Sequence, residues 1–392
     1  MEVTRKVLVL DAELSTMLAV IRSLSKYGVK VMAISNGKRG GYVSKYCWMR
    51  IDFSDIPSYA KFDAVGKVIE IEKIDAIFAH LESTIFSVWD VIHKIHTDAR
   101  VISPPRNILE FVTNKYEILK FADKLNIKIP KTEVVTPDTL EDRMKDFTFP
   151  IFVKTLKEID IPPGPGNRYI ILENIKDLPK FEEFVKKHKK VIVQEYIEGF
   201  GCGIGGLFYN GKPVAVGGHK RIRESFKTGG PSTFAVSYIH KEALEYALKL
   251  MRKLKYTGFG MVEFKIDKNG EPYLMEINPR IWGTFPLYIK SGLDLPVLAY
   301  KLFVEEDKSI LNRDYLEGFR EGIKMIYLFK DIESVIEQYS NKLQKFETII
   351  KDFLYLLFSR SVSESLLELK DLKPFIWDIL IIIRTKFGSR LI

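Results

Sequence analysis

Two carboxylates and one amide oxygen stand where two apolar, alternating runs would bring them together. Glu263 lies in GFGMVEFKID, while Glu276 and Asn278 lie in EPYLMEIN, and the turn 267–270 reads Asp-Lys-Asn-Gly. An Asn-Gly turn between alternating runs predicts a β-hairpin. Alternate strand residues share a face, so a paired register sets Glu263 opposite the other two. Hard oxygen ligands of this kind predict a Mg²⁺ site, with Mn²⁺ as a substitute; the alternative is an exposed hairpin with solvated charges.

Arginines flank this predicted metal site. Arg280 stands two residues after Asn278 and shares its face if the strand continues. Arg221 and Arg223 alternate with His219 in GHKRIRE, so period two places all three on one face. Guanidinium groups suit carboxylate or phosphoryl groups because they donate two parallel hydrogen bonds. The pattern predicts a cradle for an anionic intermediate, and the alternative is a solvated strand face.

The chain divides into three regions by its pattern of strands and helices. Residues 1–105 alternate buried strands with helices, which predicts a parallel α/β domain, and Pro104-Pro105 ends it. Its first turn, DAELST, lacks GxGxxG, so dinucleotide binding is not expected. Residues 106–305 predict a small α+β lobe at about 130–197 and an antiparallel lobe at about 198–305. The remaining 306–392 predict a helical region, with helices near 331–338, 344–358 and 374–387.

Five sequence blocks in order over about residues 110–300 resemble the ATP-grasp superfamily of carboxylate–amine ligases. They are Asn114-Lys115, FPIFVKTL, VIVQEYIEG, GHKRIRE followed by GGPST, and MEINPR. The spacing of the last blocks is most similar to the carbamoyl-phosphate-synthase-like branch, which includes many ligases of unassigned substrate. The resemblance implies a Rossmann-like domain before a two-lobed ATP-grasp domain. It leaves the acid and the amine undefined.

The resemblance also implies roles for individual residues. Lys115 and Lys154 would bind the ATP phosphates, and Glu195 would accept from the adenine amine. Backbone contacts to the nucleotide would come from the interlobe strand, namely Glu195, Tyr196 and Ile197, and Glu198 next to it would also bind the nucleotide. The metal would be held by Glu263, Glu276 and Asn278. The catalytic cations would be Arg280, Arg223 and Arg221, with the glycine turn GGPST near the reacting groups.

Three positions leave alternatives open. The family has a glycine-rich loop after the second lysine. In this chain the corresponding loop, 156–168, carries prolines at positions 162, 163 and 165. Phe200 follows the interlobe glycine where a ribose-binding Glu is usual, so Glu198 is a substitute candidate. Glu82, in AHLEST, either borders the acceptor-substrate site or is solvated beside a helix capped by Ser83 or Thr84.

The predicted reaction is ATP- and Mg²⁺-dependent joining of a small-molecule carboxylate to an amine through an acyl phosphate. The alternatives are a bicarbonate-activating carboxylase or carbamoyl-forming relative, and a nucleotide-binding regulatory protein without turnover. The net charge of +9 is spread over helices beside glutamates, so nucleic acid is not an expected partner.

The predicted location is the cytoplasm. Two distant cysteines and the lack of a signal-peptide pattern favour it. The segment LKPFIWDILIIIRTKFGSR predicts an amphipathic helix that docks on the core or on a dimer mate, or else on a membrane surface or partner.

Overall fold

The N-terminal region is a parallel sheet, as predicted, and it has five strands in the order β3-β2-β1-β4-β5. The computed structural model describes residues 5–139, 147–157, 161–162, 164–226, 229–340, 347 and 362–387. The strands are β1 (Lys6–Val9), β2 (Lys30–Ser35), β3 (Met49–Asp52), β4 (Ala76–Phe78) and β5 (Arg100–Val101). The helices are α1 (Ser15–Lys26), α2 (Ser58–Glu72) and α3 (Glu82–Ile92). Strand β3 was not predicted, because MRID has only four residues and two of them are charged.

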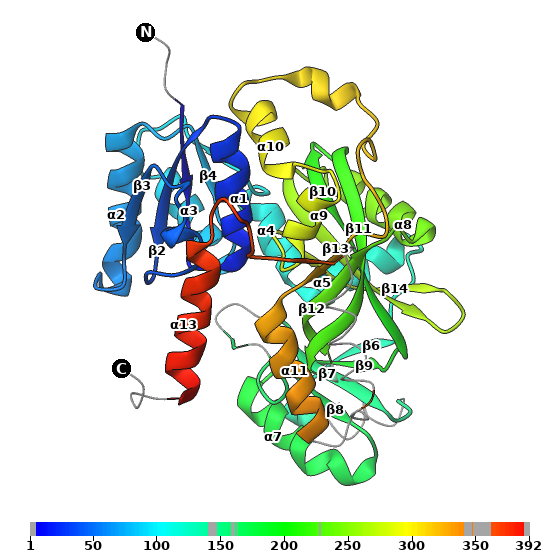
Figure 1. Cartoon of the computed structure of the whole chain (residues 1–392). Helices are drawn as coiled ribbons and strands as arrows, with labels where there is room; N and C mark the ends of the chain where they lie inside the picture. Colours follow the sequence, from blue (N-terminus) through cyan, green and yellow to red (C-terminus); the bar gives the residue numbers. More distant parts are fainter. Residues whose placement is uncertain are drawn as a thin grey trace.

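Two helices connect this domain to a four-stranded sheet of order β6-β9-β7-β8 (Figure 1). The connecting helices are α4 (Arg106–Thr113) and α5 (Lys115–Lys124). The strands are β6 (Thr132–Val135), β7 (Ile151–Thr155), β8 (Tyr169–Leu172) and β9 (Val191–Glu195), and α7 (Leu178–His188) packs on them. Strand β9 pairs with both β6 and β7, so the segment before the second lobe is a central strand rather than an edge strand.

The largest sheet has seven strands in the order β14-β13-β10-β11-β12-β15-β16. Its strands are β10 (Gly199–Tyr209), β11 (Lys212–Phe226), β12 (Gly229–Ser237), β13 (Gly258–Asp267), β14 (Pro272–Asn278), β15 (Lys324–Ile326) and β16 (Val362–Glu364). Its helices include α8 (Lys241–Lys253), α9 (Phe285–Lys290) and α10 (Leu295–Phe303). The segment GGPST is the start of β12 rather than a turn, so that prediction was wrong.

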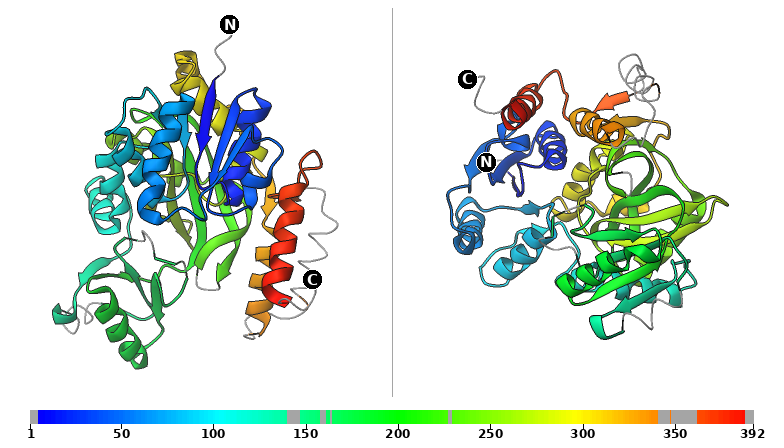
Figure 2. Two further views of the ribbon diagram at one scale, coloured as in Figure 1. Left: turned by 90° about the vertical axis from the view of Figure 1, so that its left-hand side faces the viewer. Right: turned by 90° about the horizontal axis from the view of Figure 1, so that it is seen from below.

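The C-terminal region adds both strands and helices to the molecule. Helices α11 (Leu328–Ser340) and α13 (Lys373–Phe387) confirm two of the predicted helices, while the one predicted near 344–358 lies outside the described residues except for 347. Strands β15 and β16 were not predicted, because three-residue strands carry almost no periodicity. The two views in Figure 2 place α13 beside α11, where the Phe329 and Phe375 rings lie 5.7 Å apart. No helix in the described part of the chain is long and apolar enough to span a membrane.

A buried ion pair ties the C-terminal region back to the first domain. The Arg22 guanidinium on α1 donates to Asp371 Oδ2 at 3.0 Å and to the Leu366 carbonyl at 2.8 Å. Asp371 also accepts from Ser44 Oγ at 2.6 Å and from the Lys45 amide at 3.0 Å. Because the Asp371 side chain is only 1% exposed, its charge depends on these donors.

We expect Asp371→Ala to lower the free energy of unfolding by about 3–5 kcal/mol, because it leaves the buried Arg22 charge without its carboxylate. The matched control is Glu317→Ala, which removes an ion pair with Arg313 whose side chains are 46% and 53% exposed and should leave stability nearly unchanged. Urea unfolding of both variants measures the difference. Equal stability of the two variants would show that the Arg22–Asp371 pair does not hold the C-terminal region in place.

Candidate active site

The hairpin of β13 and β14 brings the three predicted metal ligands together. The turn 267–270 joins the strands, and the register pairs Glu263 with Glu276 and Met261 with Asn278. A bulge between Glu263 and Phe264 lies beside this pair. The Asn278 amide nitrogen lies 3.2 Å from Glu276 Oε1 and 3.5 Å from Glu263 Oε2. The predicted convergence on one sheet face is therefore present.

Two lysines from outside the hairpin meet the same carboxylate. Lys115 is the first residue of α5, where the Asn114 side chain caps the helix, and its Nζ lies 2.5 Å from Glu276 Oε2. Lys154 lies in β7 with 4% of its surface exposed, and its Nζ donates to the Met275 carbonyl at 3.3 Å. Both lysines are buried, and both ammonium groups lie against β14. The structure thus brings both predicted phosphate-binding lysines to Glu276.

Arg221 balances the second carboxylate. Its Nη2 lies 2.6 Å from Glu263 Oε1, and its Nη1 donates to Glu224 Oε1 at 3.0 Å and to the Gly230 carbonyl at 3.1 Å. The side chain crosses Gly201 of β10, where a Cβ atom would come within 2.7 Å of Arg221 Cδ. Glycine at this position therefore lets the guanidinium reach Glu263.

The two carboxylates have opposite electrostatic balances. Burial raises the pKa of Glu276, but the charges of Lys115 and Lys154 outweigh burial and lower that pKa to about 2. Burial raises the pKa of Glu263, and Arg221 does not fully offset it because Glu276 and Glu224 repel a second negative charge. Glu276 is therefore the permanently ionised member of the pair.

The donor set fits a hard divalent cation that also takes ligands from a substrate. The described residues contain no cluster of three or more His, Cys, Asp or Glu that could hold a metal alone. Two carboxylates and an amide leave coordination positions for phosphate oxygens and water, which is how Mg²⁺ is usually bound. The Asn278 amide presents its nitrogen to the carboxylates while its oxygen accepts from Arg280 Nη2 at 3.1 Å, so ligation through the oxygen requires an amide flip.

Arg280 connects the hairpin to the N-terminal domain. Its Nε donates to Glu82 Oε1 at 3.4 Å, and Glu82 is the first residue of α3. The alternative of a solvated Glu82 beside a Ser83 or Thr84 cap is wrong, because Leu81 is the N-cap and makes no side-chain bond. The carboxyl edge of the parallel sheet thus faces the hairpin of β13 and β14.

Sequence reasoning missed Asp11, which organises this edge. Its carboxylate accepts from the amides of His80 and Leu81, both at 2.9 Å, and from Thr84 Oγ1 at 2.7 Å. Burial raises the Asp11 pKa to about 6 against the effect of these donors. The available signal was the position of Asp11 directly after the buried strand VLVL, at the carboxyl end of β1.

Arg223 lies apart from the other two arginines. A bulge between Arg221 and Arg223 shifts the pairing of β11 with β12, so the prediction that both share a face is wrong. The Arg223 guanidinium donates to Asp331 of α11 at 2.9–3.1 Å, and Thr233 Oγ1 donates to the same carboxylate at 2.6 Å. Asp331 is 1% exposed, so Arg223 ties α11 to the large sheet.

Comparison with known proteins places this geometry in a recognised architecture. A family model described as ATP-grasp in the biosynthetic pathway with Ter operon matches residues 187–325. Biotin carboxylase from Campylobacter jejuni is similar, with 18% identity, a TM-score of 0.65, and coverage of 82% of this chain and 74% of that one. The chain has the ATP-grasp fold.

Two further structures share this ATP-grasp fold. The biotin carboxylase domain dimer of Hydrogenobacter thermophilus 2-oxoglutarate carboxylase, in complex with MgADP, ADP and bicarbonate, has 17% identity, a TM-score of 0.65, and coverage of 82% and 73% of the two chains. The L-amino acid ligase from Bacillus licheniformis has 16% identity, a TM-score of 0.61, and coverage of 82% and 78%. At these identities the likeness establishes the fold, which confirms the two-lobed architecture inferred from sequence.

The predicted nucleotide segment joins the two ATP-grasp lobes. Glu195 is the last residue of β9, and its amide donates to the Lys131 carbonyl at 3.1 Å. Tyr196, Ile197 and Glu198 lie between β9 and β10. Gln194 points to the other face and donates to Thr132 Oγ1 at 2.8 Å, as expected of a structural residue.

Phe200 and the proline-rich loop 156–168, the two departures from the family pattern, both make packing contacts. Phe200 places its ring 3.9 Å from the Lys220 ammonium, so it serves a cation–π contact rather than a polar one. In the described part of the proline-rich loop, Gly164 lies against the Phe226 ring and Arg168 Nε donates to the Ile161 carbonyl at 2.6 Å. This part of the loop therefore rests on the end of β11.

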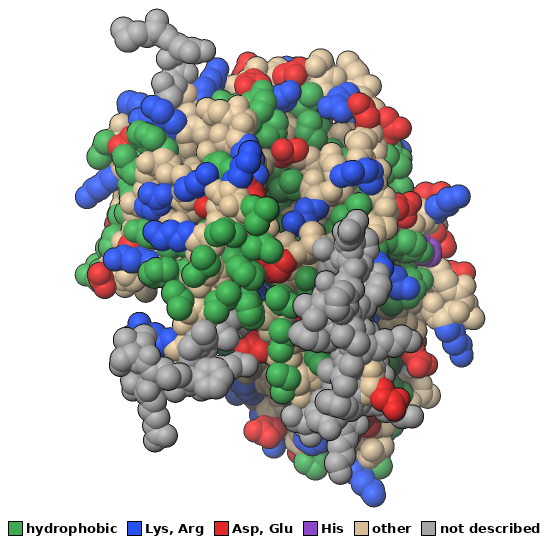
Figure 3. All heavy atoms as spheres, viewed as in Figure 1, with side chains coloured by type: hydrophobic (Ala, Val, Ile, Leu, Met, Phe, Trp, Pro, Cys, Tyr) green, Lys and Arg blue, Asp and Glu red, His purple; other side chains and the backbone are tan. Residues whose placement is uncertain are grey.

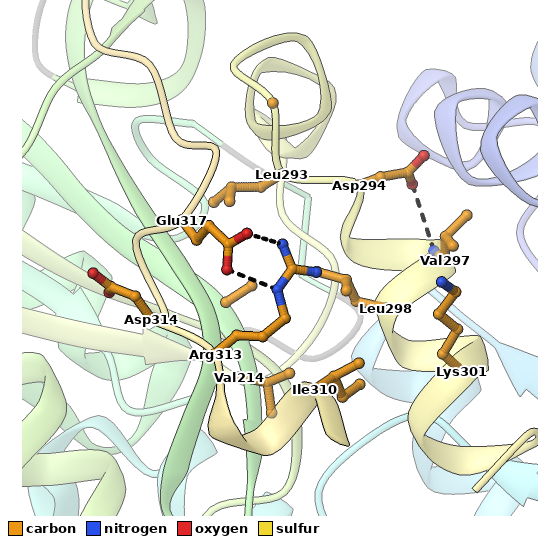
Figure 4. Close-up of a pocket in the computed structure, with 12 residues that line it drawn as sticks. Val214, Leu293, Asp294, Val297, Leu298, Lys301, Ile310, Arg313, Asp314 and Glu317 are labelled. Carbon is orange, nitrogen blue, oxygen red and sulfur yellow. Dashed lines mark hydrogen bonds and ion pairs between the residues drawn. The ribbon is translucent and has the colours of Figure 1, made fainter. Parts of the chain in front are cut away.

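A separate pocket of about 210 Å³ lies between β11, α10 and the 310–317 segment (Figure 4). Arg313 and Glu317 pair on one wall, and Asp294 accepts from the Val297 amide at the start of α10. None of its lining residues belongs to the predicted active site.

His219 of β11 is a buried, neutral imidazole. Tyr288 Oη donates to the Gly203 carbonyl at 3.2 Å, so the His219 Nδ1–H donates to Tyr288 Oη at 3.0 Å. Thr284 Oγ1 lies 3.2 Å from His219 Nε2 and donates to it. Burial lowers the His219 pKa to about 3, and the positive charge of Arg221 acts in the same direction.

We expect the wild type to lose stability relative to His219→Gln as pH falls. The folded pKa lies below the unfolded value of 6.5, so stability is fully present above 6.5 and declines as the unfolded chain takes up the proton. The difference should reach about 2 kcal/mol between pH 7.5 and about pH 5. Urea unfolding at both pH values measures it. Parallel pH profiles for the two proteins would mean that His219 is not held neutral.

Proposed function

We propose that the protein is an ATP-dependent ligase that activates a carboxylate as an acyl phosphate and joins it to an amine with a carbon–nitrogen bond. The observation that carries the proposal is the balanced charge set on the ATP-grasp fold, Lys115 with Glu276 and Arg221 with Glu263. A third ion pair, between Arg280 and Glu82, joins this set to the N-terminal domain. Charged groups whose pKa values are shifted by burial and by specific partners cluster at functional sites.

ATP would exchange partners with this charge set. Its phosphates would take Lys115 and Lys154, and Mg²⁺ or Mn²⁺ would be held by Glu263, Glu276 and Asn278. The cation neutralises phosphate charge, which is the main requirement of phosphoryl transfer. Lys115 and Lys154 neutralise the charge of Glu276 when no nucleotide is bound. A cation would have to replace them there when they turn to the phosphates, so we infer that nucleotide and cation bind together rather than separately.

The adenine would bind beside the interlobe segment. Glu195 would accept from its exocyclic amine, and Tyr196, Ile197 and Glu198 would line the slot between the lobes. Tyr196 is 37% exposed, which leaves its ring available to a ligand. Burial raises the pKa of its hydroxyl, so it stays protonated and can donate.

Arg280 and Arg221 would stabilise the reacting acid, whereas Arg223 would keep its ion pair with Asp331. A substrate carboxylate oxygen attacks the γ-phosphorus, and the bond from that phosphorus to the ADP oxygen breaks. The amine nitrogen then attacks the acyl carbon, phosphate leaves with the bonding electron pair, and the amine proton passes to solvent. Fixed guanidinium groups lower the barrier because charge spreads over the phosphoryl oxygens.

A bicarbonate-activating reaction is the second candidate. The observation in its favour is the fold shared with a biotin carboxylase domain solved with bicarbonate and MgADP. Bicarbonate would bind beside the same Arg280–Glu82 pair but would need a different acceptor.

The buried free thiols of Cys47 and Cys202 support a reducing, cytoplasmic setting. A homodimer is the proposed assembly.

We expect ADP release to depend on both an acid and an amine, measured across amino acids, dipeptides and sugar acids. Arg280→Lys should keep ATP affinity within about threefold. It should lower kcat by about a hundredfold, because Lys keeps the positive charge but cannot donate the two parallel hydrogen bonds of a guanidinium group. The matched control is Arg313→Lys on the far pocket. Acid-independent turnover with bicarbonate would favour the second candidate, and a normal Arg280→Lys would contradict the placement of Arg280.

A further inference from the structure

The C-terminal segment carries an apolar face that is exposed in the described part of the molecule. Leu369 is 85% exposed, Leu372 is exposed just before α13, and the first turns of α13 expose Ile376, Trp377 and Leu380. These five residues are called the C-terminal apolar face. Figure 3 shows hydrophobic side chains gathered over α13, with Lys and Arg side chains on the surface above them.

One side of α13 is already used for packing. Pro374 is buried, and the Phe375 ring lies against Phe329 of α11. The helix begins just after Asp371, whose bonds to Arg22 and Ser44 fix its start on the N-terminal domain. The C-terminal apolar face is therefore held outward by an anchored segment.

The acidic residues of this segment are turned inward. Glu364 accepts from the amides of Leu366 and Leu367. Glu368 pairs with Lys26 at 2.9 Å, and the half-buried Asp378 faces Lys330 and Arg39.

The basic residues of the same segment are turned outward. Lys370, Lys373 and Arg384 are all exposed. Lys370 and Lys373 lie between residues of the C-terminal apolar face along the chain, and Arg384 follows it. The outward charge of the segment is therefore positive, which complements an anionic surface.

We propose that the C-terminal apolar face binds the surface of an anionic phospholipid bilayer, with α13 lying in the plane of the interface. Leucine, isoleucine and tryptophan side chains with flanking lysine and arginine are the composition that enters the headgroup boundary. A second copy of the chain would bring the same cations against each other, which opposes pairing through this face. The proposal is independent of the ligase reaction.

The test is co-sedimentation of the full-length protein with vesicles. We expect binding to phosphatidylcholine vesicles that contain phosphatidylglycerol, weak binding to phosphatidylcholine alone, and release by high salt. Lys370→Glu with Lys373→Glu should weaken binding at least about tenfold, because each basic residue near an anionic surface contributes to it. The matched charge control is Lys67→Glu, an exposed residue of α2.

The apolar contribution has its own pair of variants. Ile376→Ser with Leu380→Ser should also abolish vesicle binding, whereas Ile71→Ser should not, although Ile71 is 75% exposed on α2. A blue shift of Trp377 fluorescence on vesicle addition, lost in Trp377→Phe, would place the face in the bilayer. Circular dichroism confirms that each variant is folded.

Three results would overturn the proposal. They are equal binding to neutral and anionic vesicles, wild-type binding by both double variants, and absence of vesicle binding by the wild type. In the last case, self-association lost in Ile376→Ser with Leu380→Ser, measured by analytical ultracentrifugation, would assign the face to a second copy. Capture of an acidic protein instead would assign it to that class of partner.

Discussion

The ion pair between Lys115 and Glu276 is the interaction on which the arrangement of the site depends. Lys115 lies at the start of α5, before the small lobe, and Glu276 lies in β14 of the large sheet. Burying either charge alone would cost several kcal/mol, so each requires the other or a replacement of the same sign. Lys154 adds a second positive charge from the small lobe. The lobes therefore meet through charges that a polyphosphate and a divalent cation would be able to take over.

The same logic extends outward through successive layers of charge. Arg221 forms an ion pair with Glu263. Arg280 contacts both Asn278 and Glu82. Glu82 is the first residue of α3, and Asp11 accepts from the amide of Leu81 just before that helix. A substrate bound at Arg280 would therefore contact the N-terminal domain as well as the hairpin. The Arg22–Asp371 pair fixes the C-terminal region to that domain.

Much of this could be predicted from local sequence. The hairpin was predictable because Asn-Gly chemistry and period-two alternation agree over residues 258–278, and Lys154 because an apolar strand precedes it. The sheet face on which Arg223 lies could not be predicted, because a bulge inserts one residue into β11. The carboxylate that binds Arg223, Asp331, is 108 positions away in the chain. Asp11 escaped notice because a single acid after a strand is common, and its donors come from residues 80–84. Long-range pairing and bulges leave no periodic trace in the sequence.

The most direct test of the central claim is the Mg²⁺ dependence of ATP affinity. Calorimetry would measure ATP binding to the wild type and to Glu276→Gln, each with Mg²⁺ and with a chelator. The account predicts that Mg²⁺ strengthens ATP binding to the wild type at least about tenfold, a coupling of about 1.4 kcal/mol or more. It predicts that most of this coupling disappears in Glu276→Gln. Equal Mg²⁺ dependence in the two proteins, or none in the wild type, would contradict the claim that this charge set binds nucleotide and cation together.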